Sequence, residues 1–258
     1  MNRHFNDLLP DIVNAINYNY TQSDLLLGKS DKYLPVRSTI IDILDDLKRL
    51  MFPGYFSTDR VDVTNASYYT GQILSSLHLK LRKQIALALA YDREPGIFSS
   101  NPDIIAEAEN ICCNFFESVP HIQEMLLLDV QAGYDGDPAA DSKEQIIFSY
   151  PGFYATFVYR IAHELYKMKV PFIPRVMTEH AHGKTGIDIN SGATIGKYFF
   201  MDHGTGIVIG ETTIIGDYVK LYQGVTLGAL STRGGQHLAG VKRHPTIEDL
   251  SLIHISEP

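Results

Sequence analysis

Residues 189–206 read INSGATIGKYFFMDHGTG, and this stretch decides the fold. It divides into three groups of six residues, which begin with Ile189, Ile195 and Met201. After two further residues the pattern resumes, and the next groups begin with Ile209, Ile215, Leu221 and Leu227. A six-residue period with an apolar first position is typical of a parallel β-helix, in which each group forms one short strand and one turn. We therefore expect these leading side chains to point inward and to stack in successive coils. A glycine-rich antiparallel sheet is the alternative, and seven groups in one phase argue against it.

The period slips by two residues beside the pair Asp202-His203. Stacked strands cannot absorb extra residues, so the insertion must bulge outward at a corner, where Gly204-Thr205-Gly206 supplies the flexibility. We expect the bulge to displace His203 from the regular wall, at a corner where another subunit can pack. Histidine titrates near neutrality and is the natural general base. Asp188 lies one coil earlier and can orient it if coils stack about 4.8 Å apart. A structural histidine that caps a turn is the alternative.

The preceding part of the chain has the spacing of helices. Apolar residues recur at i, i+3 and i+4, which predicts amphipathic helices over residues 40–51, 73–85, 104–115, 122–130 and 153–165. The polar segment Gly133–Tyr150 is predicted to connect helical layers. Pro171 and Pro174 are predicted to end the helical half. The sequence thus predicts an α+β fold, with an α-helical domain over residues 1–174 and a β-helix domain over residues 175–258.

Composition limits the classes of partner. The formal net charge of −8 argues against nucleic acid as a general partner. No apolar run is long enough for a membrane span, and the N-terminus lacks a secretory signal. Cys112 and Cys113 are adjacent and unsuited to bridging, which favours a reducing, cytoplasmic location. Residues 230–244 carry basic side chains without acids, which suits an anionic ligand.

Three further histidines are predicted to be structural. His180 and His182 form a His-x-His pair of the kind that can bind a metal. No cysteine or carboxylate framework accompanies them in the sequence, so we predict no metal. His163, on an amphipathic segment, is predicted to be packed.

These residues together resemble the serine O-acetyltransferases, which are hexapeptide-repeat acyltransferases. MDHGTGIVIGET, residues 201–212, resembles the active-site hexads of that family. Five further segments resemble its motifs: Asp137-Pro138-Ala139-Ala140-Asp141, Tyr159-Arg160-Ile161-Ala162-His163, Gly186-Ile187-Asp188-Ile189, Thr226-Leu227-Gly228 and Lys242-Arg243-His244-Pro245. The resemblance covers about residues 130–249. It implies a left-handed β-helix.

The resemblance implies that acetyl passes from acetyl-CoA to the hydroxyl of L-serine, which gives O-acetyl-L-serine and CoA in cysteine biosynthesis. His203 would be the general base, and Asp188 would orient it. Serine is a zwitterion, so its site needs both signs of charge. Asp137 and Asp202 would face the ammonium group. Three further positions are then assigned. Arg243 would bind the carboxylate, with a fork suited to it. His244 would contact the same end of the substrate, and Glu211 would support the site.

The CoA arm is assigned by the same resemblance to Thr226, Gly228 and Ala229, where backbone groups would hold it. Ala229 replaces the glycine usual in the family, and its methyl group is expected to crowd the arm slightly. The loop Ser231–Gly240 is longer than its family counterpart, and we expect it to be a mobile lid over both substrates.

Assembly and partners follow from the resemblance as well. Such β-helices trimerise with sites between subunits, and their helical halves commonly pair two trimers, so a trimer or a dimer of trimers is expected. L-Cysteine resembles serine closely and is expected to act as a feedback inhibitor. Residues Ser251–Pro258 do not resemble the family's further coils, which predicts a shortened β-helix. The final Ser-Glu-Pro also predicts no complex with O-acetylserine sulfhydrylase through this end.

Three other functions stay open from the sequence. One is O-acetylation of a sugar or another hydroxyl acceptor, which would not need Asp137 and Arg243 at opposite ends of a zwitterion. Another is a zinc lyase similar to the gamma carbonic anhydrases, although the spacing of His180, His182 and His203 fits that site poorly. The third is a truncated homologue without activity.

Overall fold

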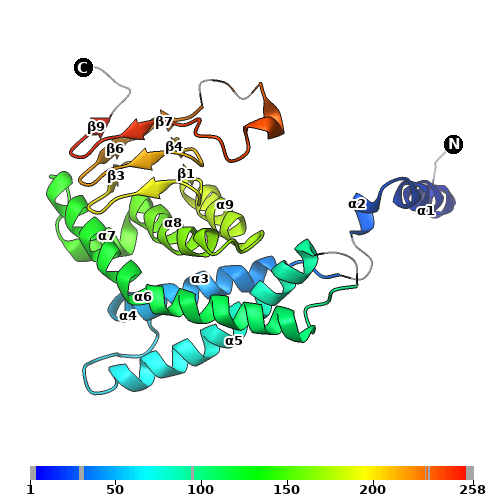
Figure 1. The fold of residues 1–258 in the computed structure, drawn as a ribbon, viewed down its shortest axis with the longest axis horizontal. Coiled ribbons are helices and arrows are strands. Elements are labelled where there is room, and N and C mark those ends of the chain that lie inside the picture. The colour runs from blue at the N-terminus through cyan, green and yellow to red at the C-terminus, as the bar shows by residue number, and fades with distance from the viewer. Residues whose placement is uncertain (1–3, 29–31, 94–95, 230, 232, 254–258) are drawn as a thin grey trace.

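Helices precede the strands along the chain, and the two form separate layers (Figure 1). The computed structural model describes residues 4–28, 32–93, 96–229, 231 and 233–253. The helices are α1 (Phe5–Gln22), α2 (Asp24–Leu27), α3 (Arg37–Met51), α4 (Pro53–Phe56), α5 (Ala66–Asp92), α6 (Pro102–Gly136), α7 (Lys143–Ser149), α8 (Pro151–Lys167) and α9 (Ile173–Thr185). In the described part of the chain, no helix is long and apolar enough to cross a membrane.

The strands wind into a left-handed parallel β-helix with three faces. They are β1 (Asp188–Ile189), β2 (Thr194–Ile195), β3 (Phe200–Asp202), β4 (Val208–Ile209), β5 (Ile214–Ile215), β6 (Lys220–Tyr222), β7 (Thr226–Leu227), β8 (Thr246–Ile247) and β9 (Leu252–Ile253). Each face is a three-stranded sheet, with strand orders β1-β4-β7, β2-β5-β8 and β3-β6-β9. The fold expected from the six-residue period is therefore confirmed.

The leading residue of each group of six points into the β-helix, as expected. Ile189 pairs with Ile209, and Ile209 pairs with Leu227, so one apolar column runs up the first face. Equivalent columns on the other two faces start at Ile195 and Met201. All of the leading side chains from Ile189 to Leu227 are buried. Burying an aliphatic side chain of this size contributes roughly 1.5–3 kcal/mol, so the columns supply the main stabilisation of the coils.

The slip in the period is visible in the strand register. Asp188 pairs with Val208, 20 positions later, whereas Val208 pairs with Thr226, 18 positions later. The first coil therefore holds two more residues than the second, and they lie at the corner between β3 and β4. A larger insertion lies between β7 and β8, since Ile214 pairs with Thr246, 32 positions later. This insertion forms the loop that carries the short 3-10 helix Gly235–Leu238.

Helices α8 and α9 lie between the β-helix and the layer of α3, α5 and α6 (Figure 1). The Tyr159 hydroxyl on α8 donates a hydrogen bond of 2.6 Å to the Ala193 carbonyl. Arg160 is buried, pairs with Asp129 of α6 and donates to the Gly196 carbonyl at 2.9 Å. The His163 Nδ1 is 2.8 Å from the Ser191 carbonyl oxygen, a contact expected of a packed histidine. These polar contacts fix the first coil to the helices.

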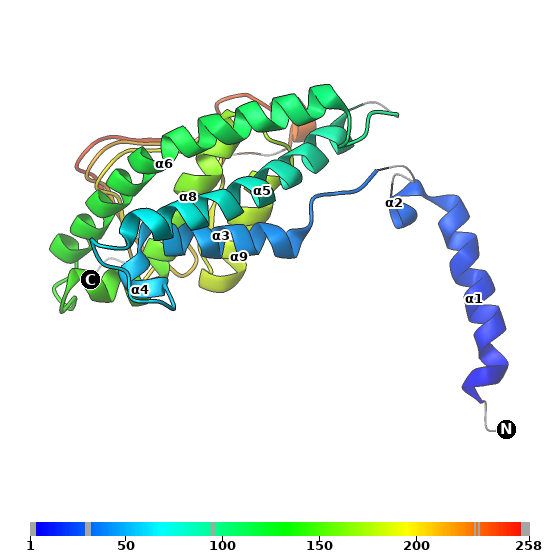
Figure 2. The same ribbon diagram turned by 90° about the horizontal axis from the view of Figure 1, so that it is seen from below.

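By contrast, α1 and α2 bury no residue and lie apart from the other helices (Figure 2).

Three boundaries differ from the sequence-based prediction. The segments 104–115 and 122–130 belong to one helix, α6, which continues through Pro120. The expected connector after Gly136 contains the helix α7. The helical half does not end at Pro171 and Pro174, because Pro174 occupies the first turn of α9, where its missing N–H is not needed. The boundary predicted at residues 174/175 therefore falls inside α9.

Candidate active site

His203 stands outside the wall of the β-helix. Its backbone has a φ of 58°, and the glycines at 204 and 206 have φ values of 84° and 79°. The extra residues are held by the coils on both sides, because the Gly206 N–H donates to the Gly186 carbonyl at 2.8 Å and the Thr205 carbonyl accepts from Gly224 at 2.9 Å. The His203 side chain is 73% exposed. The slip thus presents an imidazole to solvent on a backbone that is fixed by hydrogen bonds.

Asp202 lies between His203 and a lysine. Its Oδ1 is 3.8 Å from Nδ1 of His203, and its Oδ2 is 2.9 Å from Nζ of Lys220. The lysine also donates to the Gly136 carbonyl at 2.7 Å and lies over the Tyr222 ring, 4.4 Å from its centroid. Burial tends to lower the pKa of Lys220, but hydrogen bonds to Tyr222 and Asp202 outweigh it and raise the pKa. Lys220 therefore stays charged beside the Asp202 carboxylate.

Asp137 completes this group from the end of α6. Its Oδ2 accepts a hydrogen bond of 2.6 Å from the Tyr150 hydroxyl, and its Oδ1 accepts one of 2.8 Å from the Ala139 N–H. These two bonds lower the pKa of Asp137, and the charges of Lys220 and His203 lower it further. Burial first, and then the bond to Asp137, raise the pKa of Tyr150 to about 12. One chain therefore brings two carboxylates to the face that carries His203.

Sequence reasoning missed Lys220 and Tyr150. Lys220 begins β6 and is in register with Phe200, two positions before the pair of Asp202 and Tyr222. A basic residue one coil above Asp202 was therefore a usable signal once the slip had been counted. Tyr150 had no such signal, because its position depends on the turn between α7 and α8.

A second group of predicted residues lies around Glu211. The Arg243 Nη2 forms an ion pair with Glu211 Oε2, and the Tyr166 hydroxyl donates to Glu211 Oε1 at 3.3 Å. The Thr212 N–H donates to Nδ1 of His244 at 3.1 Å. Burial, and then the charge of Arg243, lower the pKa of His244, so the ring is neutral and its proton lies on Nε2. This group can offer a guanidinium and an imidazole N–H to an anionic group.

The two groups stand at different corners of the β-helix. His203 precedes β4, between the sheet β3-β6-β9 and the sheet β1-β4-β7, whereas Glu211 follows β4, between β1-β4-β7 and β2-β5-β8. Among the described residues, no hydrogen bond or ion pair joins His203 to Arg243. A single chain therefore brings Asp137, Asp202 and His203 together, but holds Arg243 and His244 at another corner.

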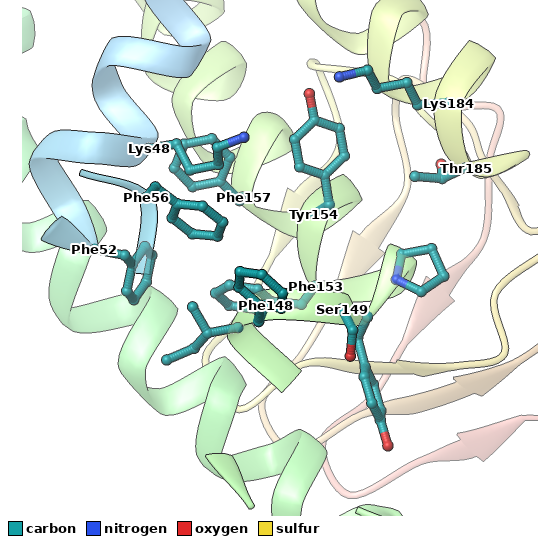
Figure 3. Close-up of a pocket in the computed structure, with 13 residues that line it drawn as sticks. Lys48, Phe52, Phe56, Phe148, Ser149, Phe153, Tyr154, Phe157, Lys184 and Thr185 are labelled. Atoms are coloured by element: carbon teal, nitrogen blue, oxygen red, sulfur yellow. The ribbon is translucent and has the colours of Figure 1, made fainter. Parts of the chain in front are cut away.

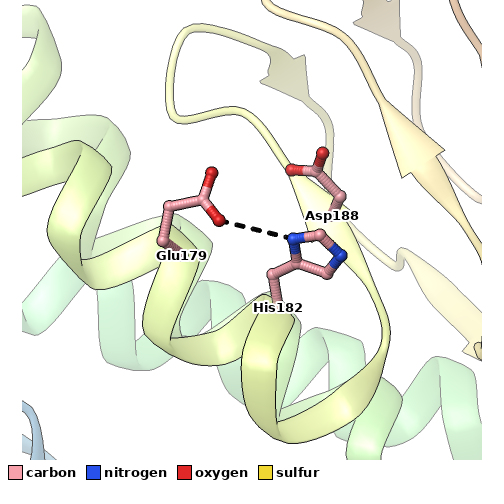
Figure 4. A group of neighbouring side chains, drawn as sticks. All are labelled: Glu179, His182 and Asp188. Carbon is pink, nitrogen blue, oxygen red and sulfur yellow. Dashed lines mark hydrogen bonds and ion pairs between the residues drawn. The ribbon is translucent and has the colours of Figure 1, made fainter.

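Asp188 faces the C-terminal turn of α9 (Figure 4). One possible ligand atom from each of Glu179, His182 and Asp188 lies within 4.8 Å of the others, and Nδ1 of His182 is 3.4 Å from Oε2 of Glu179. The expectation that no carboxylate accompanies His182 is therefore wrong, because the helix and the first strand bring two acids to it. Within the described chain Asp188 forms no ion pair with His203, so its orienting role stays a prediction.

The residues assigned to CoA lie along β7. Thr226 is exposed, and Gly228 and Ala229 are half-buried. Among the described strands β7 pairs with β4 alone. Arg243 donates through Nη1 to the Leu238 carbonyl at 3.1 Å, which ties the adjacent loop to the second group. Residues 230 and 232 of this region lie outside the described residues.

Comparison with known proteins identifies the family. No protein-family model matches the chain. The chain is 40% identical to the plasmid serine acetyltransferase of Synechococcus elongatus over 232 residues, which is 87% of this chain and 73% of that relative. The chain belongs to the serine acetyltransferase family.

Other serine acetyltransferases support the assignment. The Bacillus subtilis enzyme is 48% identical over 129 residues, 50% of this chain, and the match spans 57% of that relative's length. The crystal structure of serine acetyltransferase 1 from Entamoeba histolytica has a TM-score of 0.69 and 35% identity, and covers 87% of this chain and 76% of its own. The same enzyme in complex with L-cysteine has a TM-score of 0.69 and 34% identity, with coverages of 89% and 81%. The acyltransferase class predicted from the sequence is confirmed.

Proposed function

We propose that the chain transfers the acetyl group of acetyl-CoA to the hydroxyl of L-serine, with His203 as the general base. The observation that carries this proposal is the exposed imidazole at the slipped corner, next to the carboxylates of Asp137 and Asp202. A serine hydroxyl is a weak nucleophile, so a base must take its proton as the oxygen attacks the thioester carbonyl. The C–S bond then breaks, and the CoA thiolate receives the proton from His203.

The two carboxylates suit the ammonium group of serine. Asp202 uses Oδ2 for Lys220, which leaves Oδ1 for His203 and for the substrate. Asp137 is a carboxylate at neutral pH, and the hydrogen bond from the Tyr150 hydroxyl lowers its pKa below the ordinary value. Two anions beside one base explain a preference for an amino acid over a neutral sugar. Asp188 remains our candidate for orienting His203.

A second copy of the chain is proposed to supply the carboxylate subsite. Arg243 and His244 lie at a different corner from His203, so one chain holds only part of a zwitterion site. In a trimer around an axis parallel to the β-helix, each corner of one subunit can face a different corner of its neighbour. Glu211 would hold the guanidinium of Arg243 in place, and the neutral His244 would donate through Nε2. Pairing of two such trimers is our further expectation.

The CoA arm is proposed to lie beside Thr226, Gly228 and Ala229, where backbone groups would hold it. The loop Ser231–Gly240 is proposed to close over both substrates.

Because the related Entamoeba enzyme was crystallised with L-cysteine, we propose that cysteine occupies the serine site here and competes with serine. No metal takes part in this scheme.

The test is release of free thiol from acetyl-CoA with L-serine as the acceptor. His203→Asn is the sharpest variant, because asparagine tolerates a positive φ and removes the base. We expect its kcat to fall by about 10²- to 10⁴-fold. His121→Ala, a change at an exposed histidine that pairs with Glu124, should leave the rate unchanged. Equal rates for His203→Asn and the parent chain would refute the proposal, and faster transfer to glucose than to serine would favour a sugar acetyltransferase.

A further inference from the structure

A cavity of about 280 Å³ lies among the helices (Figure 3). Its walls come from α3, α4, α7, α8 and α9 and are mainly aromatic, with Phe52, Phe56, Phe148, Phe153 and Phe157. Ligand pockets for drug-sized molecules have volumes of roughly 300–1,000 Å³, so this cavity suits a ligand of one or two rings.

One end of the cavity is cationic. The ammonium groups of Lys48 and Lys184 approach the Tyr154 ring, at 5.8 Å and 5.3 Å from its centroid (Figure 3). Lys48 already pairs with Asp45 at 3.2 Å. Lys184 forms no ion pair with an acid among the described residues. At this end of the cavity Lys184 therefore carries a positive charge without an ion-pair partner among the described residues.

Two buried polar atoms lack a hydrogen-bond partner in this region. The hydroxyl oxygen of Tyr154 is buried and unpaired, and so is Nε2 of His180. Burial first, and then the charge of Asp45, raise the pKa of Tyr154 to about 12, so its hydroxyl is a donor at neutral pH. The charges that act on His180 are those of Lys184, Arg37, Asp45 and Lys48, three cations and one anion. An unpaired buried donor costs about 1–3 kcal/mol, which an acceptor on a ligand would recover.

We propose that this cavity binds a small planar aromatic carboxylate. Its ring would lie between the phenylalanine side chains, and its carboxylate would accept a hydrogen bond from the Tyr154 hydroxyl and pair with Lys184. A neutral aromatic molecule would fill the cavity but leave the cation unpaired. A phosphate-sized inorganic anion would pair with the cation but leave the aromatic walls empty.

The cavity also borders the candidate active site. Tyr150 lines the cavity, and its hydroxyl donates to Asp137 at 2.6 Å. A bound ligand that shifts Tyr150 changes the carboxylate that we assign to the serine ammonium group. This coupling rests on the proposed function, whereas binding to the cavity does not.

The test uses 2-naphthoate, whose fluorescence is readily followed because the chain contains no tryptophan. We expect saturable binding to the full chain. Lys184→Met and Tyr154→Phe should each weaken it by about ten-fold or more, the usual loss for a hydrogen bond or ion pair to a charged group. Lys143→Met is the matched control, because Lys143 also lies over a ring, that of Tyr134 at 6.0 Å, but does not line the cavity.

Three results would overturn the site. The first is no saturable binding, the second is that Lys184→Met and Tyr154→Phe bind naphthoate as tightly as the parent chain, and the third is that neutral 2-naphthylmethanol binds as tightly as naphthoate. The coupling is tested separately with saturating naphthoate. We expect the KM for serine to change while the KM for acetyl-CoA stays constant, and an unchanged serine KM would contradict the coupling. A chain that binds naphthoate but transfers no acetyl group would refute the proposed function and leave the cavity site intact.

Discussion

The ammonium group of Lys220 lies 2.9 Å from Oδ2 of Asp202, the carboxylate whose other oxygen faces His203. Asp202 is only 9% exposed, so solvent can do little to stabilise its charge. The lysine is therefore the counter-ion of a carboxylate that the coil stacking has withdrawn from water.

Lys220→Met should accordingly destabilise the protein. Removing one partner of a largely buried ion pair leaves the other charge uncompensated, at a cost of about 3–5 kcal/mol. The matched change is Lys197→Met, which removes an exposed pair with Asp217 at 3.7 Å and should cost about 0–1 kcal/mol. Urea unfolding followed by circular dichroism measures both. Similar midpoints for the two variants would show that Asp202 does not depend on Lys220.

Gly204→Ala should displace His203. Gly204 has a φ of 84°, and a Cβ there would lie 2.5 Å from Cδ1 of Ile187. Backbone strain of this kind costs about 1–3 kcal/mol, and the clash adds to it. Gly96→Ala is the control, since Gly96 has a φ of 86° but no atom within 4 Å of its added Cβ. The midpoint temperature of thermal unfolding and kcat should both fall further for Gly204→Ala than for Gly96→Ala. Equal losses in the two variants would mean that backbone strain alone, and not the clash with Ile187, causes them.

The sequence predicted the β-helix well because its constraint is local and repeated. Each coil must bury the same kind of side chain at the same position, so Ile189, Ile209 and Leu227 reveal their stacking without any structure. The two-residue slip could be counted in the sequence, and it predicted that His203 would be exposed. Lys220 and Tyr150 escaped notice because their roles depend on contacts across coils and between α7 and α8. The carboxylates beside His182 were missed for a similar reason, since Glu179 and Asp188 come from a helix and a strand.

Tyr150→Phe should shift the acid limb of the pH profile. The Tyr150 hydroxyl is the largest cause of the lowered pKa of Asp137, which is about 3.9 in unfolded chains. A carboxyl whose pKa falls on folding stabilises the native state above that ordinary value, and its contribution is lost as the pH falls through the lowered one. Without the hydroxyl, the pKa of Asp137 rises, so kcat/KM for serine should begin to fall at a higher pH. Tyr68→Phe, at an exposed tyrosine, should leave the profile in place. An unmoved acid limb in Tyr150→Phe would separate Asp137 from serine binding.

Mixed assemblies test whether the serine site spans two subunits. His203→Asn and Arg243→Gln should each be almost inactive alone, because every site in such an assembly lacks either the base or the guanidinium. When the two variants are co-expressed, a mixed trimer contains one interface at which an intact His203 meets an intact Arg243, so about one third of the sites should recover. The control pairs His203→Asn with a chain that carries both changes, because no interface can then be complete. Recovery in the first mixture but not in the second would place the two residues in one site on different chains. If neither mixture recovers although both form mixed trimers, Arg243 does not act together with the base of a neighbouring subunit, and the zwitterion site proposed here is wrong.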